Sequence, residues 1–138
     1  MSIPIVDLDS FLKSFYASPV SSFVTNGHGF ILEANHAAGE MFNVHNHLSM
    51  KNKRLVSFAH RKFTNELNNL IGTFRAHDEV NSNLIEMRPR GSQSFRSIIN
   101  ANIISRSKMI VLVHWKIKNA SFCEHVEDAD YGILSSTG

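Results

Sequence analysis

The chain has 138 residues, of which 43% are hydrophobic and 19% charged, and its formal net charge is only +2. That length suits one domain able to bury roughly two thirds of its unfolded surface, which excludes a wholly disordered protein. The longest apolar run is a few residues, the first ten residues carry no basic side chain, and Cys123 is the only cysteine. We therefore expect a cytoplasmic protein with no membrane span, secretory signal or internal disulfide.

Residues 7–16 are predicted to form a short amphipathic helix. Asp7 or Asp9 can cap its N-terminus by accepting free backbone N–H bonds. Four apolar residues then form one helical stripe, namely Leu8, Phe11, Leu12 and Phe15.

Two apolar runs, residues 20–25 and 30–33, come next and predict a β-hairpin. The Asn26-Gly27 pair between them supplies the positive φ of a tight turn. The alternative, a phosphate-binding loop built on Gly27 and Gly29, is disfavoured because no helix follows with the required spacing.

The middle of the chain is predicted to be helical with a polar interruption. Asn35 can cap a short helix that runs to Phe42, and residues 43–54 indicate a loop. A longer helix is expected over residues 57–74, where apolar residues repeat at helical spacing.

Three strands are predicted at residues 80–88, 94–105 and 108–118. Alternate side chains of the last two give one face that is apolar throughout and another that begins apolar and ends polar. The N-terminal helix, from this chain or from a partner, is the candidate cover for that second face. The element order predicts an α+β fold, a five-stranded antiparallel sheet with helices on one face and an N-terminal capping helix.

The segment from Ala17 to Asn35 resembles the opening of a PAS domain, a sensory and interaction module of signalling proteins. In that family a short strand, an Asp/Asn-Gly turn and a second strand end in an Asn that begins the next helix. Residues 55–60 resemble the approach to the long helix of the family, and residues 113–121 resemble its closing strand.

This resemblance covers about residues 17–121. Together with the predicted helix before it and the acidic residues after it, this divides the chain into an N-terminal helix, a PAS domain and an acidic tail, at residues 1–18, 19–121 and 122–138. Asn119, Ala120 and Ser121 stand where the family usually has the Asp-Ile-Thr triplet that links sensor to effector. Coupling to an effector by that route is therefore not expected, and both a stand-alone protein and a piece of a longer regulator fit the sequence.

The resemblance also bears on cofactors. It places the haem-ligand position near Asn65, which cannot coordinate iron, and the helical region lacks the cysteine that flavin-binding light sensors need. We expect no haem, flavin or other cofactor, and an unidentified small ligand stays open. His45 and His47, with His36 close by, have no accompanying carboxylate or cysteine, so solvated loop histidines are favoured over a metal site.

The function expected from the resemblance is non-enzymatic signal transduction by homodimerisation or by docking to an unknown signalling protein. In one mechanism a small apolar ligand fills a pocket lined by Phe42, Phe58, Leu67, Leu70, Ile99 and Val113. In the other, favoured by ten phenylalanines, the core fills itself. The expected dimer contacts are Leu8, Phe11, Leu12, Phe15, Ile110 and Leu112.

Two other classes of function are disfavoured by the sequence. A nucleic-acid-binding accessory would use a basic surface at Lys51, Lys53, Arg54, Arg61 and Lys62, with a further cluster at Arg88, Arg90 and Arg96. A solvated face is favoured, because the aromatic residues sit at core spacings. A small α+β enzyme is disfavoured because no spacing joins a nucleophile to a base or pairs two carboxylates.

Charge is unevenly distributed along the chain. Residues 19–118 hold 13 lysines and arginines against 6 aspartates and glutamates, whereas residues 119–138 hold four acids and no base. One hypothesis is that the acidic tail folds back on the basic face of the domain or competes with an acidic partner for it.

Overall fold

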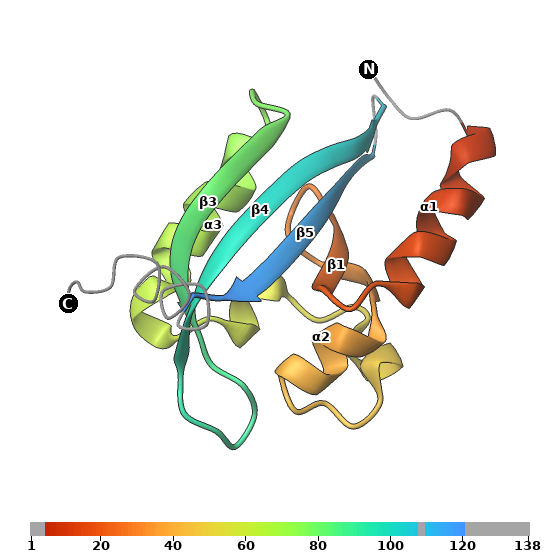
Figure 1. Cartoon of the computed structure of the whole chain (residues 1–138). Helices are drawn as coiled ribbons and strands as arrows, with labels where there is room; N and C mark the ends of the chain where they lie inside the picture. Colours follow the sequence, from red (N-terminus) through yellow and green to blue (C-terminus); the bar gives the residue numbers. More distant parts are fainter. Residues whose placement is uncertain (1–4, 108–109, 121–138) are drawn as a thin grey trace, which may run out of the picture.

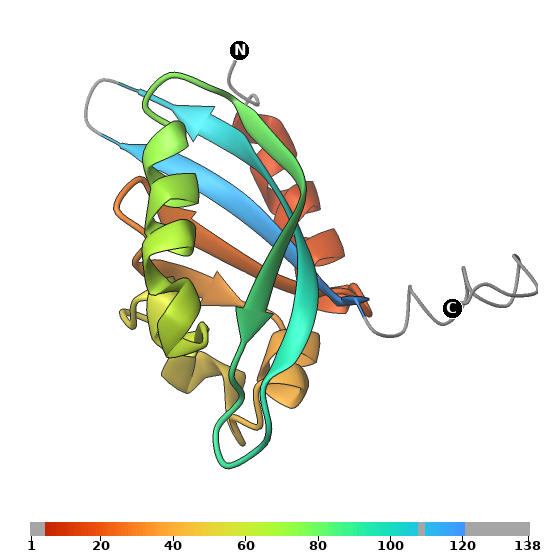
Figure 2. The ribbon, with the colours of Figure 1, turned by 90° about the vertical axis from the view of Figure 1, so that its left-hand side faces the viewer.

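A twisted antiparallel sheet with strand order β2-β1-β5-β4-β3 organises the computed structural model, which describes residues 5–107 and 110–120. Figures 1 and 2 show α3 on one face of this sheet and α1 on the other. The predicted fold class is thus confirmed. The strands are β1 Ser21–Asn26, β2 Ile31–Ala34, β3 Glu79–Met87, β4 Phe95–Arg106 and β5 Val111–Asn119. The helices are α1 Ile5–Ala17, α2 His36–Met41 and α3 Thr64–Thr73, with 3-10 turns η1 His47–Met50, η2 Leu55–Phe58 and η3 Arg61–Phe63.

The N-terminal helix begins earlier than predicted. Because α1 starts at Ile5, Asp7 and Asp9 lie inside the helix, and the expectation that one of them caps it is wrong. The helix ends at Ala17, two residues before Pro19. It packs on the sheet of its own chain, one of the two covers that the sequence left open. The acidic tail lies outside the described residues.

The predicted hairpin of β1 and β2 is confirmed, with Phe23 opposite Ala34. Its positive φ is at Gly29, at 87°, and not at the Asn-Gly pair. A Cβ on Gly29 would lie 2.7 Å from Cδ1 of Ile71, so this turn also needs glycine because it touches α3.

The long helix is shorter than the sequence predicts, since α3 covers only Thr64–Thr73. The backbone before it is extended at Ala59 and His60. There Ala59 forms an isolated bridge with Met87, and the N–H of His60 donates to the carbonyl of Glu86 at 2.8 Å. Pairing with β3 therefore replaces the first helical turns.

Strand β4 carries a β-bulge near its end, where its apolar residues lie on both faces of the sheet. Ile103 pairs with Val113 and Ser105 with Leu112, which leaves Ile104 as the extra residue. Ile103 packs against the main core, whereas Ile104 is buried on the opposite face beneath α1. Ile104 therefore contributes to the apolar sheet surface on which α1 packs, the seat of α1.

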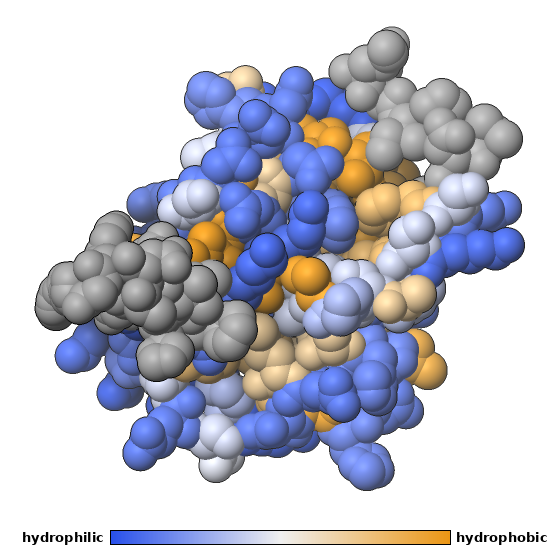
Figure 3. Space-filling model, in the orientation of Figure 1, coloured by the Kyte–Doolittle hydropathy of each residue, from blue (hydrophilic) through white to orange (hydrophobic). Residues whose placement is uncertain are grey.

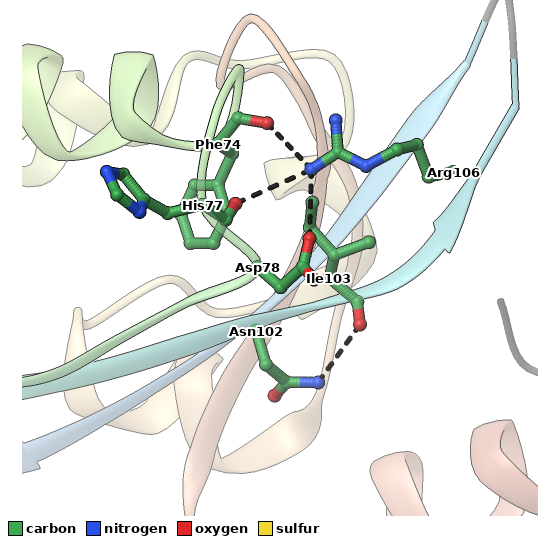
Figure 4. A network of polar contacts seen from close by, with 6 residues as sticks. All are labelled: Phe74, His77, Asp78, Asn102, Ile103 and Arg106. Atoms are coloured by element: carbon green, nitrogen blue, oxygen red, sulfur yellow. Dashed lines mark hydrogen bonds and ion pairs between the residues drawn. The ribbon is translucent and has the colours of Figure 1, made fainter. Parts of the chain in front are cut away.

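The segment between α3 and β3 is fixed to the sheet by one arginine (Figure 4). Nη2 of Arg106 donates to the carbonyl of Phe74 at 3.0 Å and to the carboxylate of Asp78 at 3.2 Å. The carbonyl of Asp78 in turn accepts from the N–H of Ile103 at 2.8 Å. These contacts hold α3 against the end of β4.

Candidate functional site

The six residues expected to line a ligand pocket all meet in the core between the sheet and α3. Five are buried there and Leu70 packs against them from the edge. The rings of Phe42 and Phe58 are 5.3 Å apart, and Phe23 lies 5.8 Å from Phe42. Trp115, fully buried beside them, donates from Nε1 to Oγ1 of Thr25 at 2.8 Å. Aromatic side chains thus occupy this core themselves.

The opposite face of the sheet carries a second, smaller apolar cluster beneath α1. Phe15 of α1 is buried against Val24 and Ile104, and Phe11 and Leu112 pack at its margin. Three of the expected dimer contacts, Phe11, Phe15 and Leu112, are therefore used within the chain.

The other expected dimer contacts have different surroundings. Ile110 is 57% exposed, Leu12 is half-buried, and the side chain of Leu8 lies outside the described residues. Figure 3 shows that this face of the molecule carries apolar patches among polar side chains. Ile110 precedes Leu112, which packs at the margin of the α1 cluster, by two residues along the chain.

His114 is half-buried beneath α1. Its ring meets Phe11 edge-on at 5.0 Å and Phe15 at 5.8 Å. Its Nε2 is shielded from solvent and makes no hydrogen bond within the described part of the chain. Burial, and secondarily the charge of Lys116, lowers the pKa of His114 to about 4. The strand alternation places His114 on this face, but it does not show that a helix encloses it.

The seat of α1 is incompletely filled. A hollow of about 300 Å³ lies between the helix and the sheet. Phe11 and Phe15 border it from α1, and Ser22, His114 and Lys116 border it from the strands. This interface is therefore looser than the aromatic core on the other face.

Asn35 joins α1, β1 and α2 through its buried side chain. Oδ1 accepts from the N–H of Ser22 at 3.1 Å and from that of Ala38 at 2.9 Å, which confirms the predicted helix cap. Nδ2 donates to the carbonyls of Phe15 at 3.0 Å and Val20 at 2.8 Å. The sequence predicts only the cap. The hydrogen bonds that Nδ2 donates around the end of α1 depend on where that helix docks.

A second polar tie links α1 to the sheet at Tyr16. Its hydroxyl donates to Oε1 of Glu33, whose other oxygen lies 3.5 Å from Nζ of Lys51. Burial first, and then the hydrogen bond and charge of Glu33, raise the pKa of Tyr16 to about 12. The tyrosine therefore stays protonated as a donor at neutral pH.

The predicted basic surface is divided by the fold. Lys51 pairs with Glu33, and the guanidinium of Arg54 lies 5.7 Å from the ring centroid of Phe30. Arg61 and Lys62 are exposed on η3. Lys53 lines a surface hollow together with Arg88 and Arg90, which the sequence placed in another cluster.

The histidines near α2 show no built metal site. His36 and His47 have ring centroids 6.0 Å apart, Nδ1 of His47 lies 2.8 Å from the carbonyl oxygen of Ala34, and His45 is exposed. Within residues 5–107 and 110–120, no three His, Cys, Asp or Glu side chains come together as metal ligands. Asn65, the position that the resemblance gives to a haem ligand, is exposed on α3.

No helix of the described residues is long and apolar enough to cross a membrane.

Comparison with known proteins identifies the fold. No family model and no curated protein matches the sequence. Among solved structures, a PAS domain from Colwellia psychrerythraea superposes with a TM-score of 0.68 at 13% identity, over 81% of this chain and 95% of that one. The PAS domain of a LuxR-family transcriptional regulator from Burkholderia thailandensis, in complex with ethanol, gives 0.65 at 12% identity, over 80% and 97%.

A third structural neighbour is an RNA-binding light-oxygen-voltage receptor, with a TM-score of 0.70 at 14% identity, over 91% of this chain and 36% of that one. Such likenesses, at low identity and across diverse proteins, establish the fold. The chain has the PAS fold, as the resemblance implied.

Proposed function

We propose that this chain is a non-enzymatic signal-transduction module that acts by dimerisation or partner docking through the face covered by α1. Proteins with the same fold support a signalling role, among them a two-component sensor histidine kinase and a LuxR-family transcriptional regulator. In each of these proteins the matched part is the PAS domain.

The observation that carries the proposal is the incomplete seat of α1. Among the side chains that the structure describes, Phe15 is the buried residue of the helix on this face, which also holds a hollow of about 300 Å³ and an Nε2 of His114 without a partner there. A cover held this weakly can shift without unfolding the sheet. Such a shift changes the surface offered to a second molecule.

The partner that we favour is a second copy of this chain. Ile110, two residues before Leu112 of the α1 cluster, has an apolar side chain that is 57% exposed. Two copies that meet here would cover Ile110 and the half-buried Leu12. The aromatic packing of the core supports a mechanism that needs no bound ligand.

Light scattering coupled to size exclusion tests this at tens of micromolar protein. We expect a homodimer that the Ile110→Asp variant converts to monomer, since a charge there cannot be buried without a partner. Leu48→Asp is the matched control, because Leu48 is 53% exposed on η1, a separate part of the surface. It should leave the dimer intact.

Native mass spectrometry of freshly purified protein checks the same proposal independently. Twice the chain mass without added mass is expected. A monomer at every concentration, or a dimer that Ile110→Asp leaves unchanged, contradicts dimerisation through this surface. A retained small molecule contradicts the ligand-free mechanism.

A further inference from the structure

The surface also has a hollow of about 380 Å³ with a basic rim. Its lining is charged, whereas the seat of α1 is mainly apolar. Two segments line the hollow. Lys53, Ser57 and Phe58 come from the chain around η2, and residues 88–91 come from the β3–β4 connection, the loop below the sheet in Figure 1. Its volume is within the range of small-molecule sites, roughly 300–1,000 Å³.

Backbone hydrogen bonds fix the two segments relative to each other. The N–H of Arg88 donates to the carbonyl of Phe58 at 2.7 Å, and that of Arg90 donates to the carbonyl of Phe42 at 3.1 Å. Nδ2 of Asn43 closes the loop by donating to the carbonyl of Arg90 at 3.1 Å. The side chains of both arginines therefore start from fixed positions around the hollow.

The charge of the hollow is uncompensated. Lys53, Arg88 and Arg90 are exposed, and the lining residues include no aspartate or glutamate. Within the described residues, none of the three forms an ion pair, in contrast to Lys51 and Arg106. Three like charges around one concave surface concentrate a positive potential there, which an anion would relieve.

We propose that this hollow binds the polyphosphate group of a small soluble ligand. Three cations match the charge of a di- or triphosphate better than that of a monoanion, and guanidinium groups bind phosphate oxygens in pairs. Phe58 and Pro89 give the hollow an apolar floor on which the remainder of such a ligand can rest. The hydroxyl of Ser57 contributes no free proton, because it donates to the carbonyl of Arg54 at 2.6 Å.

Titration calorimetry with inorganic tripolyphosphate at low ionic strength tests the site. We expect one site per chain and at least a tenfold loss of affinity in the triple variant K53S/R88S/R90S. The matched control K13S/R75S/K118S removes the same charge from exposed positions elsewhere and should change the affinity less than threefold. Thermal unfolding of both variants verifies that they fold, and R90S alone, expected to lose at least threefold, serves if the triple variant does not.

Three outcomes would overturn the proposal. One is that tripolyphosphate does not bind, and another is an equal loss of affinity in both triple variants, which would reflect net charge alone. The third is that a 12-nucleotide single-stranded RNA binds more tightly than tripolyphosphate and loses that binding in K53S/R88S/R90S, because the hollow would then serve nucleic acid. The site is independent of the proposed dimerisation, so neither test decides the other.

Discussion

The two faces of the sheet are closed in different ways. On the inner face, α2, α3 and the 3-10 turns bury a continuous cluster of aromatic and aliphatic side chains around Trp115 and Phe42. On the outer face α1 buries a smaller cluster of Phe15, Val24 and Ile104. The ring of His114 there contacts the rings of Phe11 and Phe15. Polar ties from Asn35 and Tyr16 hold the end of that helix.

This difference separates what holds the fold from what can move. Loss of the inner cluster removes most of the buried apolar surface, so the sheet cannot survive it. Loss of the outer cluster costs only the docking of α1, and the sheet beneath keeps its hydrogen bonds. We therefore expect α1 to open at lower free energy than the rest of the domain.

The largest effect is expected from Phe42→Ala compared with Phe15→Ala. Phe42 is fully buried among other rings, so its truncation should lower the free energy of unfolding by about 3–5 kcal/mol. Phe15→Ala should cost about 2 kcal/mol, because the loss cannot exceed the free energy with which α1 docks. Urea unfolding of both variants measures the difference. Equal losses would contradict the distinction between the two faces.

Asn35→Asp is expected to have the next largest effect, about 2–4 kcal/mol at pH 7. The carboxylate keeps the acceptor of the α2 cap but replaces the amide donor, so a buried charge faces the carbonyls of Phe15 and Val20. Protonation of the new carboxyl restores a donor, so part of the loss should be recovered near pH 4. Asn35→Ala is the control, since its loss should show no such recovery; parallel pH profiles would refute the role given to Nδ2.

The inner face was the more predictable of the two from the sequence. Alternation along β4 and β5 correctly assigns Ile99, Val113 and Trp115 to it, because a period of two is imposed by the strand itself. The start of α3 was not predictable in this way. Residues 57–63 carry helical spacing, but the backbone at Ala59 and His60 pairs with β3, which is distant in the chain.

The outer face and the basic hollow depend on long-range placement. The cover of His114 and the amide contacts of Asn35 exist only once α1 has docked. Alternation along β4 places Ile104 on the outer face, but its burial there depends on contact with α1. Likewise, Lys53 and Arg88 are 35 positions apart, and pairing that includes the bond from Arg88 to Phe58 brings their segments together.

His114 predicts that the domain loses stability in mild acid. The pKa of His114 in the folded state, about 4, lies below its ordinary value of about 6.5. Between these two pH values the unfolded chain therefore binds a proton at His114 that the folded chain does not bind. The contribution is complete above pH 6.5 and is lost as the pH falls from 6.5 to 4. We expect a decrease of roughly 1–2 kcal/mol, because a ring with some solvent contact realises only part of the effect of full burial.

The measurement is a series of urea titrations between pH 7 and pH 4, with His114→Leu as the matched variant. This variant cannot take up the proton, so its free energy of unfolding should fall less over this range than that of the parent. Identical slopes would show that other groups cause the acid sensitivity. Hydrogen exchange should place the first loss of protection in α1, since Phe11 and Phe15 enclose the ring.

The smallest effect is expected at the exposed tie between Tyr16 and Glu33. A double-mutant cycle of Tyr16→Phe and Glu33→Gln isolates this hydrogen bond from the contact between Glu33 and Lys51. We expect a coupling of about 0.5–1 kcal/mol, the range of a hydrogen bond that competes with water. The coupling free energy should be seen in the hydrogen-exchange rates of the α1 amides, and the midpoint of global unfolding should stay almost unchanged. Coupling that appears instead in global unfolding would mean that α1 and the sheet open as one unit, and the outer face would then have no independent motion with which to signal.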